Sequence, residues 1–207
     1  MITSKKELLF YIKADRIIAG VTPIRGVKER LKELISPNYT LSYLKAMRYV
    51  AYFVNIKKRG TLSYYYHLIR FNRLGAKLGF SIGYNAFGYG LLIPHYGTIV
   101  VNSDTQAGNY CVLHTSTCIG GAGKVVGNGL YLASGAQIMG GGIILGNNVS
   151  VAASSMVNRS FEDSNILLAG LPAVLKKSSL PWYNRDGEVY SKRVERIELL
   201  KKDLKLN

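Results

Sequence analysis

Aliphatic residues recur at every sixth position through the middle of the chain. They stand at Val126, Leu132 and Ile138 and, after one extra residue in the run Gly140 to Gly142, at Leu145, Val151 and Val157. Small residues follow three of them four places later, at Ala136, Val149 and Ser155. A period of six with one aliphatic and one small residue per unit suits a triangular prism, in which each short strand forms one side and three units close a coil.

The same spacing occurs upstream in two runs. The first run is Phe87, Ile93 and Ile99, and the second is Ala107, Leu113 and Ile119, with a slip of two residues between the runs. A small β-sandwich would instead alternate with a period of two and turn after about eight to twelve residues. The segment 126–157 lacks that alternation. We therefore predict a mainly β fold with a parallel β-helix over residues 79–177.

The flanking segments have helical spacing. Before the repeat we expect helices within residues 5–35, broken near Gly20 and Pro23, and then over 41–58 and 62–78. After it, residues 165–173 indicate a strand that leaves the last coil and is turned by Gly170 and Pro172. Residues 178–187 then form a loop, and 188–206 an exposed helix with i, i+4 charge pairs. The chain divides into a basic helical region 1–78, the β-helix 79–177 and a C-terminal loop and helix 178–207.

The net charge of +15 is concentrated in the N-terminal third of the chain. Residues 1–78 contain 16 Lys and Arg against 4 Asp and Glu, whereas Asp104 and Lys124 are the only charged residues in 79–157. Such a field attracts anionic ligands or membrane surfaces, although a solvated helical surface explains it equally well. No nucleic-acid module accompanies the charge, so we expect no nucleic-acid partner.

Tyrosine is dense in the same region, over residues 39–66. Tyrosine and arginine interleaved on short helices could lie on a membrane surface. We favour the alternative, in which this stripe packs one helix against the next or against a neighbouring subunit. His67 belongs to the stripe, and we expect it to be a structural histidine whose hydrogen bonds are satisfied.

The remaining composition indicates a cytoplasmic protein that is soluble or peripheral to a membrane. Cys111 and Cys118 lack metal-ligand or CxxC spacing, and we expect them to be reduced and structural. The first residues lack an apolar signal core, and the sequence contains no apolar run of about 18 residues. Nothing in the sequence indicates a bound metal.

Two of the three histidines, His95 and His114, lie in the repeat. Imidazole titrates near neutral pH, so an exposed His95 at a coil corner could remove a proton from a hydroxyl group. A corner histidine could also serve only as a hydrogen-bonding group. Residue chemistry leaves both roles open.

Ordered motifs in this region resemble those of the hexapeptide acyltransferases, in particular the serine acetyltransferases and the O-acetyltransferases of capsule and exopolysaccharide gene clusters. The resemblance covers roughly residues 78–177. Its motifs are 85–91, 94–102 (which contains His95), 119–121, 151–154 and 169–173. It implies a left-handed β-helix, an obligate homotrimer, and acetyl-CoA bound along the groove between adjacent prisms.

The resemblance also assigns roles to individual residues. His95 matches the histidine that acts as general base and deprotonates the acceptor hydroxyl for direct attack on the thioester. The small residues at the positions that border the pantetheine arm are Ser134, Gly135 and Ala153. Lys176 and Lys177 fall where the family places a basic residue near the nucleotide of CoA, although a solvated lysine pair is the alternative.

Departures from the family pattern concern the acceptor. Serine acetyltransferases carry an aspartate shortly before the base, and the matching stretch 80–84 has no acidic residue. Their second histidine is missing from the loop 122–124, and their helical domain is usually longer than residues 1–78. His114 resembles a histidine of some polysaccharide-cluster members and is a candidate for acceptor binding.

These observations lead to one main hypothesis and several alternatives. We predict an O-acetyltransferase that moves acetyl from acetyl-CoA to a hydroxyl of a sugar or surface-polysaccharide precursor. The alternatives are a serine O-acetyltransferase that acts on L-serine, a sugar N-acetyltransferase, and a non-catalytic β-helix scaffold. The basic N-terminal region could also dock on the inner face of the cell membrane.

Overall fold

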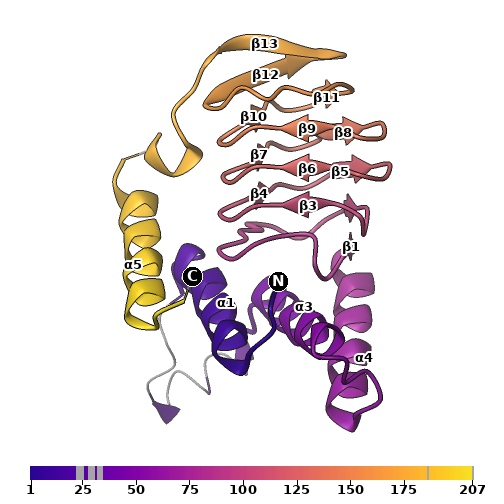
Figure 1. Cartoon of the computed structure of the whole chain (residues 1–207), viewed down its shortest axis with the longest axis vertical. Coiled ribbons are helices and arrows are strands. Elements are labelled where there is room, and N and C mark those ends of the chain that lie inside the picture. The colour runs from indigo at the N-terminus through magenta and orange to yellow at the C-terminus, as the bar shows by residue number, and fades with distance from the viewer. Residues whose placement is uncertain (22–25, 28–30, 32–34, 186, 207) are drawn as a thin grey trace.

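The computed structural model describes residues 1–207 except 22–25, 28–30, 32–34, 186 and 207. Most of the helix expected at 27–35 lies outside the described residues. The rest of the chain forms a stack of β-coils that stands on three helices, with a further helix beside its lower end (Figure 1). Both termini lie at the helical end of the stack (Figure 1).

Each of the three N-terminal helices described here begins at a residue whose side chain caps the helix. Ser4 and Glu7 form a capping box at the start of the first helix, and Thr61 caps the third. Gly79 ends the third helix with a left-handed φ of 79°, which glycine adopts without steric cost. The helices are α1 (Lys5–Ile18), α3 (Tyr39–Asn55) and α4 (Leu62–Leu78). The prediction for 62–78 is confirmed, and the helix expected over 41–58 begins and ends slightly earlier.

Three sheets form the sides of the prism, and their strands are parallel except for β13. The first sheet contains β1 (Phe80–Ile82), β2 (Ile99–Val101), β5 (Thr117–Gly120), β8 (Gln137–Met139) and β11 (Met156–Val157). The second contains β4 (Val112–Leu113), β7 (Tyr131–Leu132), β10 (Ser150–Val151), β12 (Ile166–Gly170) and β13 (Ala173–Ser178). The third contains β3 (Gln106–Ala107), β6 (Val125–Val126) and β9 (Ile144–Leu145). The predicted parallel β-helix is confirmed.

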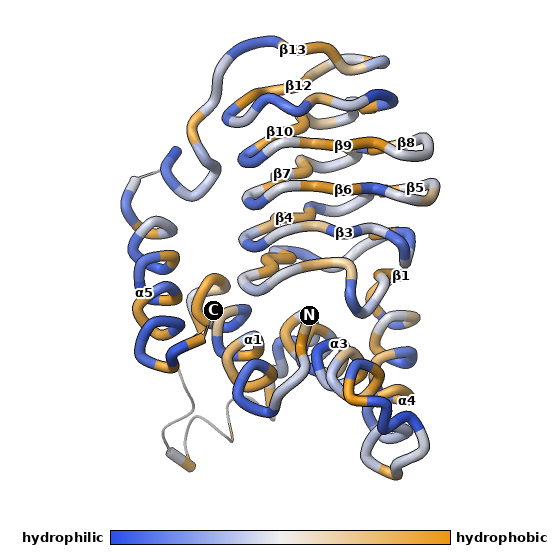
Figure 2. Tube along the Cα trace, viewed as in Figure 1, coloured by the Kyte–Doolittle hydropathy of each residue, from blue (hydrophilic) through white to orange (hydrophobic). Residues whose placement is uncertain are grey.

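The register explains why the period of six produces this stack. Val125 pairs with Ile144, and Val112 with Tyr131, an advance of 19 residues per coil in both cases. All six aliphatic positions predicted to point inward over 126–157 are buried, and so are the three small positions. In Figure 2 the strands are predominantly hydrophobic and the left-hand corners hydrophilic. The core is therefore a column inside the prism.

One detail of the upstream repeat differs from the prediction. The slip of two residues was expected between Ile99 and Ala107, but Ile99 pairs with Thr117 and Val101 pairs with Ile119. The residue of β2 that lies in the same aliphatic column as Ile119 is therefore Val101. The two extra residues lie instead in the turn before Ile99, which contains His95.

A ladder of asparagine side chains joins successive coils at another corner. The Oδ1 atom of Asn109 accepts a hydrogen bond from the backbone of Tyr89 (3.1 Å). Asn128 accepts from the backbone of Asn109 (2.8 Å), and Asn147 accepts from that of Asn128 (2.9 Å). These side chains satisfy backbone N–H groups that the turning chain leaves without a partner in a strand.

The C-terminal segment differs from its prediction in two respects. β12 does not leave the coil, because it pairs with β10 and then turns back through Gly170 and Pro172 into the antiparallel strand β13. The expected loop 178–187 contains a short 3₁₀ turn, Trp182–Asn184, whose Trp182 indole donates to the carbonyl of Tyr110 (2.7 Å).

The last helix, α5 (Val189–Asp203), was predicted to be exposed, and that prediction is wrong for one of its faces. Ile197 is fully buried, and Glu198 accepts hydrogen bonds from the hydroxyls of Tyr89 (3.0 Å) and Tyr110. Arg193 donates to the carbonyl of Ile18 at the end of α1 (3.0 Å). α5 therefore packs against both the helical base and the first coils.

The tyrosine-rich helices pack largely as expected. Tyr43 of α3 stacks on Phe71 of α4, with ring centroids 5.0 Å apart. Tyr49 stacks on His67 at 3.9 Å, and burial, Lys45 and Arg70 lower the pKa of this histidine. Its Nδ1 atom is buried without a hydrogen-bond partner among the described residues, so the expectation of a satisfied histidine is wrong. No helix in the described part of the chain is long and apolar enough to cross a membrane.

Candidate active site at a corner of the β-helix

His95 and His114 come from the same corner of two successive coils. His114 directly follows β4, and the two extra residues of the preceding coil enlarge the turn that contains His95. The turn packs against the next coil, since a Cβ at Gly97 would stand 3.2 Å from a methyl group of Thr115. The end of α4 also holds the turn, because the Gly97 N–H donates to the carbonyl of Leu78 (3.0 Å). His95 is exposed on this turn.

The two imidazoles are close enough to affect one another electrostatically. Burial lowers the pKa of His114 below its ordinary value of 6.5, and the neighbouring His95 lowers it further. The ring of His114 also packs against Tyr131, with the centroids 5.1 Å apart. His114 is therefore favoured in its neutral form, in which one ring nitrogen donates a hydrogen bond and the other accepts one.

The small residues assigned from the sequence continue this corner along the prism. Ser134 follows β7 and Ala153 follows β10, so they occupy the same turn in the next two coils. Gly135 stands one place further, and its N–H donates to the carbonyl of Thr115 (3.0 Å). Its φ of 73° and the nearby hydroxyl of Ser154, 3.2 Å from a Cβ at this position, favour glycine here. Ser134 and Ala153 are exposed, and the turns that contain them carry no charged residue.

Lys176 and Lys177 lie on β13, at the opposite end of the second sheet from His114. Lys177 pairs with Leu167 of β12, and the strand order β13, β12, β10, β7, β4 puts four strand spacings between β13 and β4. Four spacings amount to about 19 Å. Both lysines are exposed. Lys177 is level with Tyr131 rather than with the corner, because Leu167 pairs with Ser150 and Ser150 pairs with Tyr131. A ligand that contacts both the histidines and the lysines must therefore be long.

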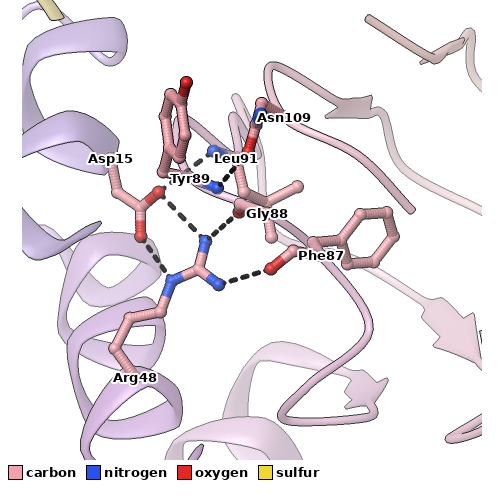
Figure 3. A network of polar contacts seen from close by, with 7 residues as sticks. All are labelled: Asp15, Arg48, Phe87, Gly88, Tyr89, Leu91 and Asn109. Atoms are coloured by element: carbon pink, nitrogen blue, oxygen red, sulfur yellow. Dashed lines mark hydrogen bonds and ion pairs between the residues drawn. The ribbon is translucent and has the colours of Figure 1, made fainter. Parts of the chain in front are cut away.

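A buried ion pair fixes the chain segment that leads to the His95 turn. The carboxylate of Asp15 on α1 accepts hydrogen bonds from the guanidinium of Arg48 on α3 at 2.9 and 3.1 Å. Arg48 also donates to the carbonyls of Phe87 (2.8 Å) and Gly88 (2.7 Å), and Asp15 accepts from the backbone of Leu91 (3.0 Å). Figure 3 shows this network between the two helices and the coil. Both charged side chains are almost fully buried, so the helices hold residues 87–91 directly.

The glycine-rich loop at 121–124, which lacks the second histidine of the family, contains a lysine that points inward. The Nζ atom of Lys124 donates to the carbonyl of Gly121 (2.7 Å) and to that of Gly140 in the next coil. The residue is fully buried, and this burial lowers its pKa. Lys124 therefore closes a corner of the prism. No cluster of His, Cys, Asp and Glu that could hold a metal ion occurs in the described part of the chain.

Neither Tyr131, which packs against His114, nor Arg185, which packs against Tyr131, was identified from the sequence. Tyr131 points outward from β7, and the guanidinium of Arg185 lies 5.3 Å from its ring centroid. Arg185 also donates to the carbonyl of Leu180 (3.0 Å) and to the hydroxyl of Ser150. The advance of 19 residues per coil could have placed Tyr131 near His114, whereas Arg185 reaches this position only because the C-terminal segment folds back along the prism.

The pKa of His114 provides a direct test of this arrangement. We expect His114 to titrate below 6.5 in an NMR titration, and His95→Gln to raise the pKa of His114 because the electrostatic effect of the neighbouring imidazole is removed. Since folding lowers this pKa, the unfolded state binds more protons near and below pH 6.5, so this contribution to stability is lost as the pH falls through that range. An unchanged His114 pKa in His95→Gln would contradict the proximity of the two rings.

Several solved serine acetyltransferases have a similar architecture. The enzyme of Neisseria gonorrhoeae, solved in complex with serine, is 22% identical with a TM-score of 0.64, and the match covers 84% of this chain and 71% of that one. The soybean apoenzyme is 20% identical with a TM-score of 0.64, covering 82% and 69%. A serine acetyltransferase in complex with CoA is 19% identical with a TM-score of 0.60, covering 82% and 68%. The chain has the serine acetyltransferase fold. No protein-family model and no curated protein matches the sequence.

The likeness to serine acetyltransferases extends beyond the coil. A match over more than four-fifths of the chain includes part of the helical base as well as the prism. At these identities the comparison demonstrates a shared fold, and the hexapeptide-repeat architecture inferred from the sequence motifs is confirmed. Function depends on the residues of a site rather than on the fold, so the chemistry of the corner depends on the residues that form it.

Proposed function

We propose that this protein is an acetyl-CoA-dependent O-acetyltransferase that acetylates a hydroxyl group of a sugar or surface-polysaccharide precursor. The observation that supports this function best is the shared corner of His95 and His114, whose next two turns carry the small residues Ser134, Gly135 and Ala153. Similar structures were solved with CoA and with serine, which favours acyl transfer to a hydroxyl group.

In the proposed reaction His95 acts as the general base. Its imidazole takes the proton of the acceptor hydroxyl as the oxygen attacks the thioester carbonyl of acetyl-CoA. The carbon–sulfur bond then breaks, and the departing thiolate receives the proton from the imidazolium. No acyl-enzyme is needed, because one site holds both substrates in reach of each other. His114, in its neutral form, donates a hydrogen bond to the acceptor and orients it.

The corner provides the binding groups for acetyl-CoA. The pantetheine arm would run past Ser134, Gly135 and Ala153, where small side chains let a narrow ligand approach the backbone. Lys176 and Lys177 would face the phosphates of the nucleotide, to which their charge is complementary. We further propose that the chain works as a homotrimer, in which a neighbouring prism forms the other wall of this groove.

The acceptor is assigned from the charge of the first coils. L-serine carries an ammonium group, for which a carboxylate is the natural partner. Residues 79–103, which include β1 and the His95 turn, contain no Asp or Glu. A sugar hydroxyl requires hydrogen bonds rather than a carboxylate. L-serine remains the second candidate, because a similar structure holds serine.

The experiment that decides between them measures CoA release from acetyl-CoA by the purified protein. Nucleotide sugars and oligosaccharide fragments are compared with L-serine, an amino sugar and a control without acceptor. We expect release that depends on a sugar hydroxyl. Release with L-serine alone would overturn the sugar assignment, and release only with the amino sugar would indicate N-acetylation.

A further inference from the structure

The hairpin of α3 and α4 carries positive charge without any acidic residue. From residue 34 to residue 103 the sequence contains no Asp or Glu, and it contains these basic residues: Lys45, Arg48, Lys57, Lys58, Arg59, Arg70, Arg73 and Lys77. Among them Arg48 is neutralised by Asp15 inside the protein. The others are exposed, and three form a continuous run, 57–59, in the turn between the helices. The hairpin therefore presents a surface of one sign.

The outer side of α4 combines this charge with large apolar side chains. Leu62 is 90% exposed, Tyr65 51%, Tyr66 58% and Ile69 49%. They share one side of the helix with Arg70, Arg73 and Lys77, because all seven recur at helical spacings. The opposite side contacts α3 and β1, and it contains the buried residues Gly75 and Leu78. We call these seven residues and the basic turn 57–59 the α4 surface.

A groove runs along this surface where α4 meets the start of α3. It encloses about 430 Å³ and is lined by Tyr39 and Ser42 on one side and by Tyr66, Arg70 and Arg73 on the other. Arg70 donates a hydrogen bond to the Tyr66 hydroxyl (3.3 Å). A groove of this size with two guanidinium groups and hydroxyls suits a phosphate-bearing headgroup.

We propose that the α4 surface binds the headgroup region of an anionic lipid bilayer. Exposed leucine, isoleucine and tyrosine beside arginine and lysine are typical of helices that lie in a membrane interface. Nucleic acid would use the basic groups but has no comparable use for Leu62 and Ile69. A second copy of the same surface would place like charges against one another. This inference is independent of the acetyl-transfer activity.

The test is co-sedimentation of the full chain with vesicles. Phosphatidylcholine vesicles with about one-third phosphatidylglycerol are compared with pure phosphatidylcholine at low and at high salt. We expect binding only to the anionic vesicles and a loss of binding at high salt. The variant K57Q/K58Q/R59Q should bind these vesicles at least about tenfold more weakly, because each basic residue near an anionic surface contributes to the affinity.

Matched control variants test whether vesicle binding depends on the α4 surface itself or only on the net charge and the exposed apolar area of the whole protein. R196Q/K202Q/K205Q removes the same number of charges from exposed positions on and just after α5, and it should bind like the unchanged protein. L62Q/I69Q should bind more weakly, whereas V189Q/L199Q, which replaces two exposed apolar residues of α5, should not. Thermal unfolding of each variant confirms that it is folded.

Several outcomes would overturn the proposal. One is no binding of the unchanged protein to anionic vesicles at low salt, and another is equal weakening by the two charge variants. Binding to an oligonucleotide that L62Q/I69Q leaves unchanged, without vesicle binding, would indicate nucleic acid instead. If the unchanged protein did not bind vesicles, and light scattering showed that K57Q/K58Q/R59Q has a different oligomeric mass, the surface would be assigned to contact with a second copy of the chain.

Discussion

His95→Ala is expected to lower kcat/KM for acetyl transfer by about 10²-fold or more while the affinity for acetyl-CoA changes little. The loss follows from the removal of the group that accepts the acceptor proton. Binding should persist because the small residues of the corner and the two lysines of β13 are untouched. Steady-state kinetics gives the first quantity, and calorimetric titration with acetyl-CoA gives the second.

The matched control for this variant is His67→Ala. It removes the same side chain from α4, where His67 stacks on Tyr49 away from the corner. We expect it to retain activity and to lose only some stability. Equal activity of His95→Ala and the unchanged protein would remove His95 from the mechanism. If the unchanged protein bound acetyl-CoA but released no CoA with any acceptor, the scaffold alternative would gain support.

Arg48→Ala is expected to destabilise the protein by about 3–5 kcal/mol. The substitution leaves the Asp15 carboxylate buried without its cation, and it also removes the donors to the carbonyls of Phe87 and Gly88. Urea unfolding monitored by circular dichroism measures the free energy of unfolding. Lys45→Ala, an exposed position on the same helix, should change it by no more than about 0.5 kcal/mol.

A double variant distinguishes the ion pair from simple loss of packing. Asp15→Leu/Arg48→Met removes both charges and keeps apolar volume, so it should be more stable than Arg48→Ala. The opposite order would mean that the bonds to residues 87–91, rather than the uncompensated charge, account for the cost. A change of less than about 1 kcal/mol in Arg48→Ala would contradict the buried network.

The sequence by itself determined the regular part of this protein. The period of six identified the inward residues from Val126 to Val157, because each coil buries the same positions and the pattern is local in sequence. The helix 62–78 was predicted from its helical spacing, and the structure gives it the same bounds, with a threonine cap and a glycine end that are also short-range features of the sequence. The candidate corner residues came from ordered motifs, and the coil geometry places His95, His114, Ser134, Gly135 and Ala153 along one edge.

Only the tertiary structure decided the contacts between elements that are distant in sequence. Asp15 and Arg48 stand 33 residues apart on helices whose periodicity gives no sign of a polar partner. Glu198 reaches Tyr89 across 109 residues, and Arg185 reaches Tyr131 because β13 sends the chain back along the prism. The enlarged His95 turn also depended on pairing, because hexad spacing cannot tell which of two neighbouring buried residues, Ile99 or Val101, occupies the aliphatic column. Periodicity records which face of an element is buried, whereas the partner of a buried charge and the register between coils are set by packing in three dimensions.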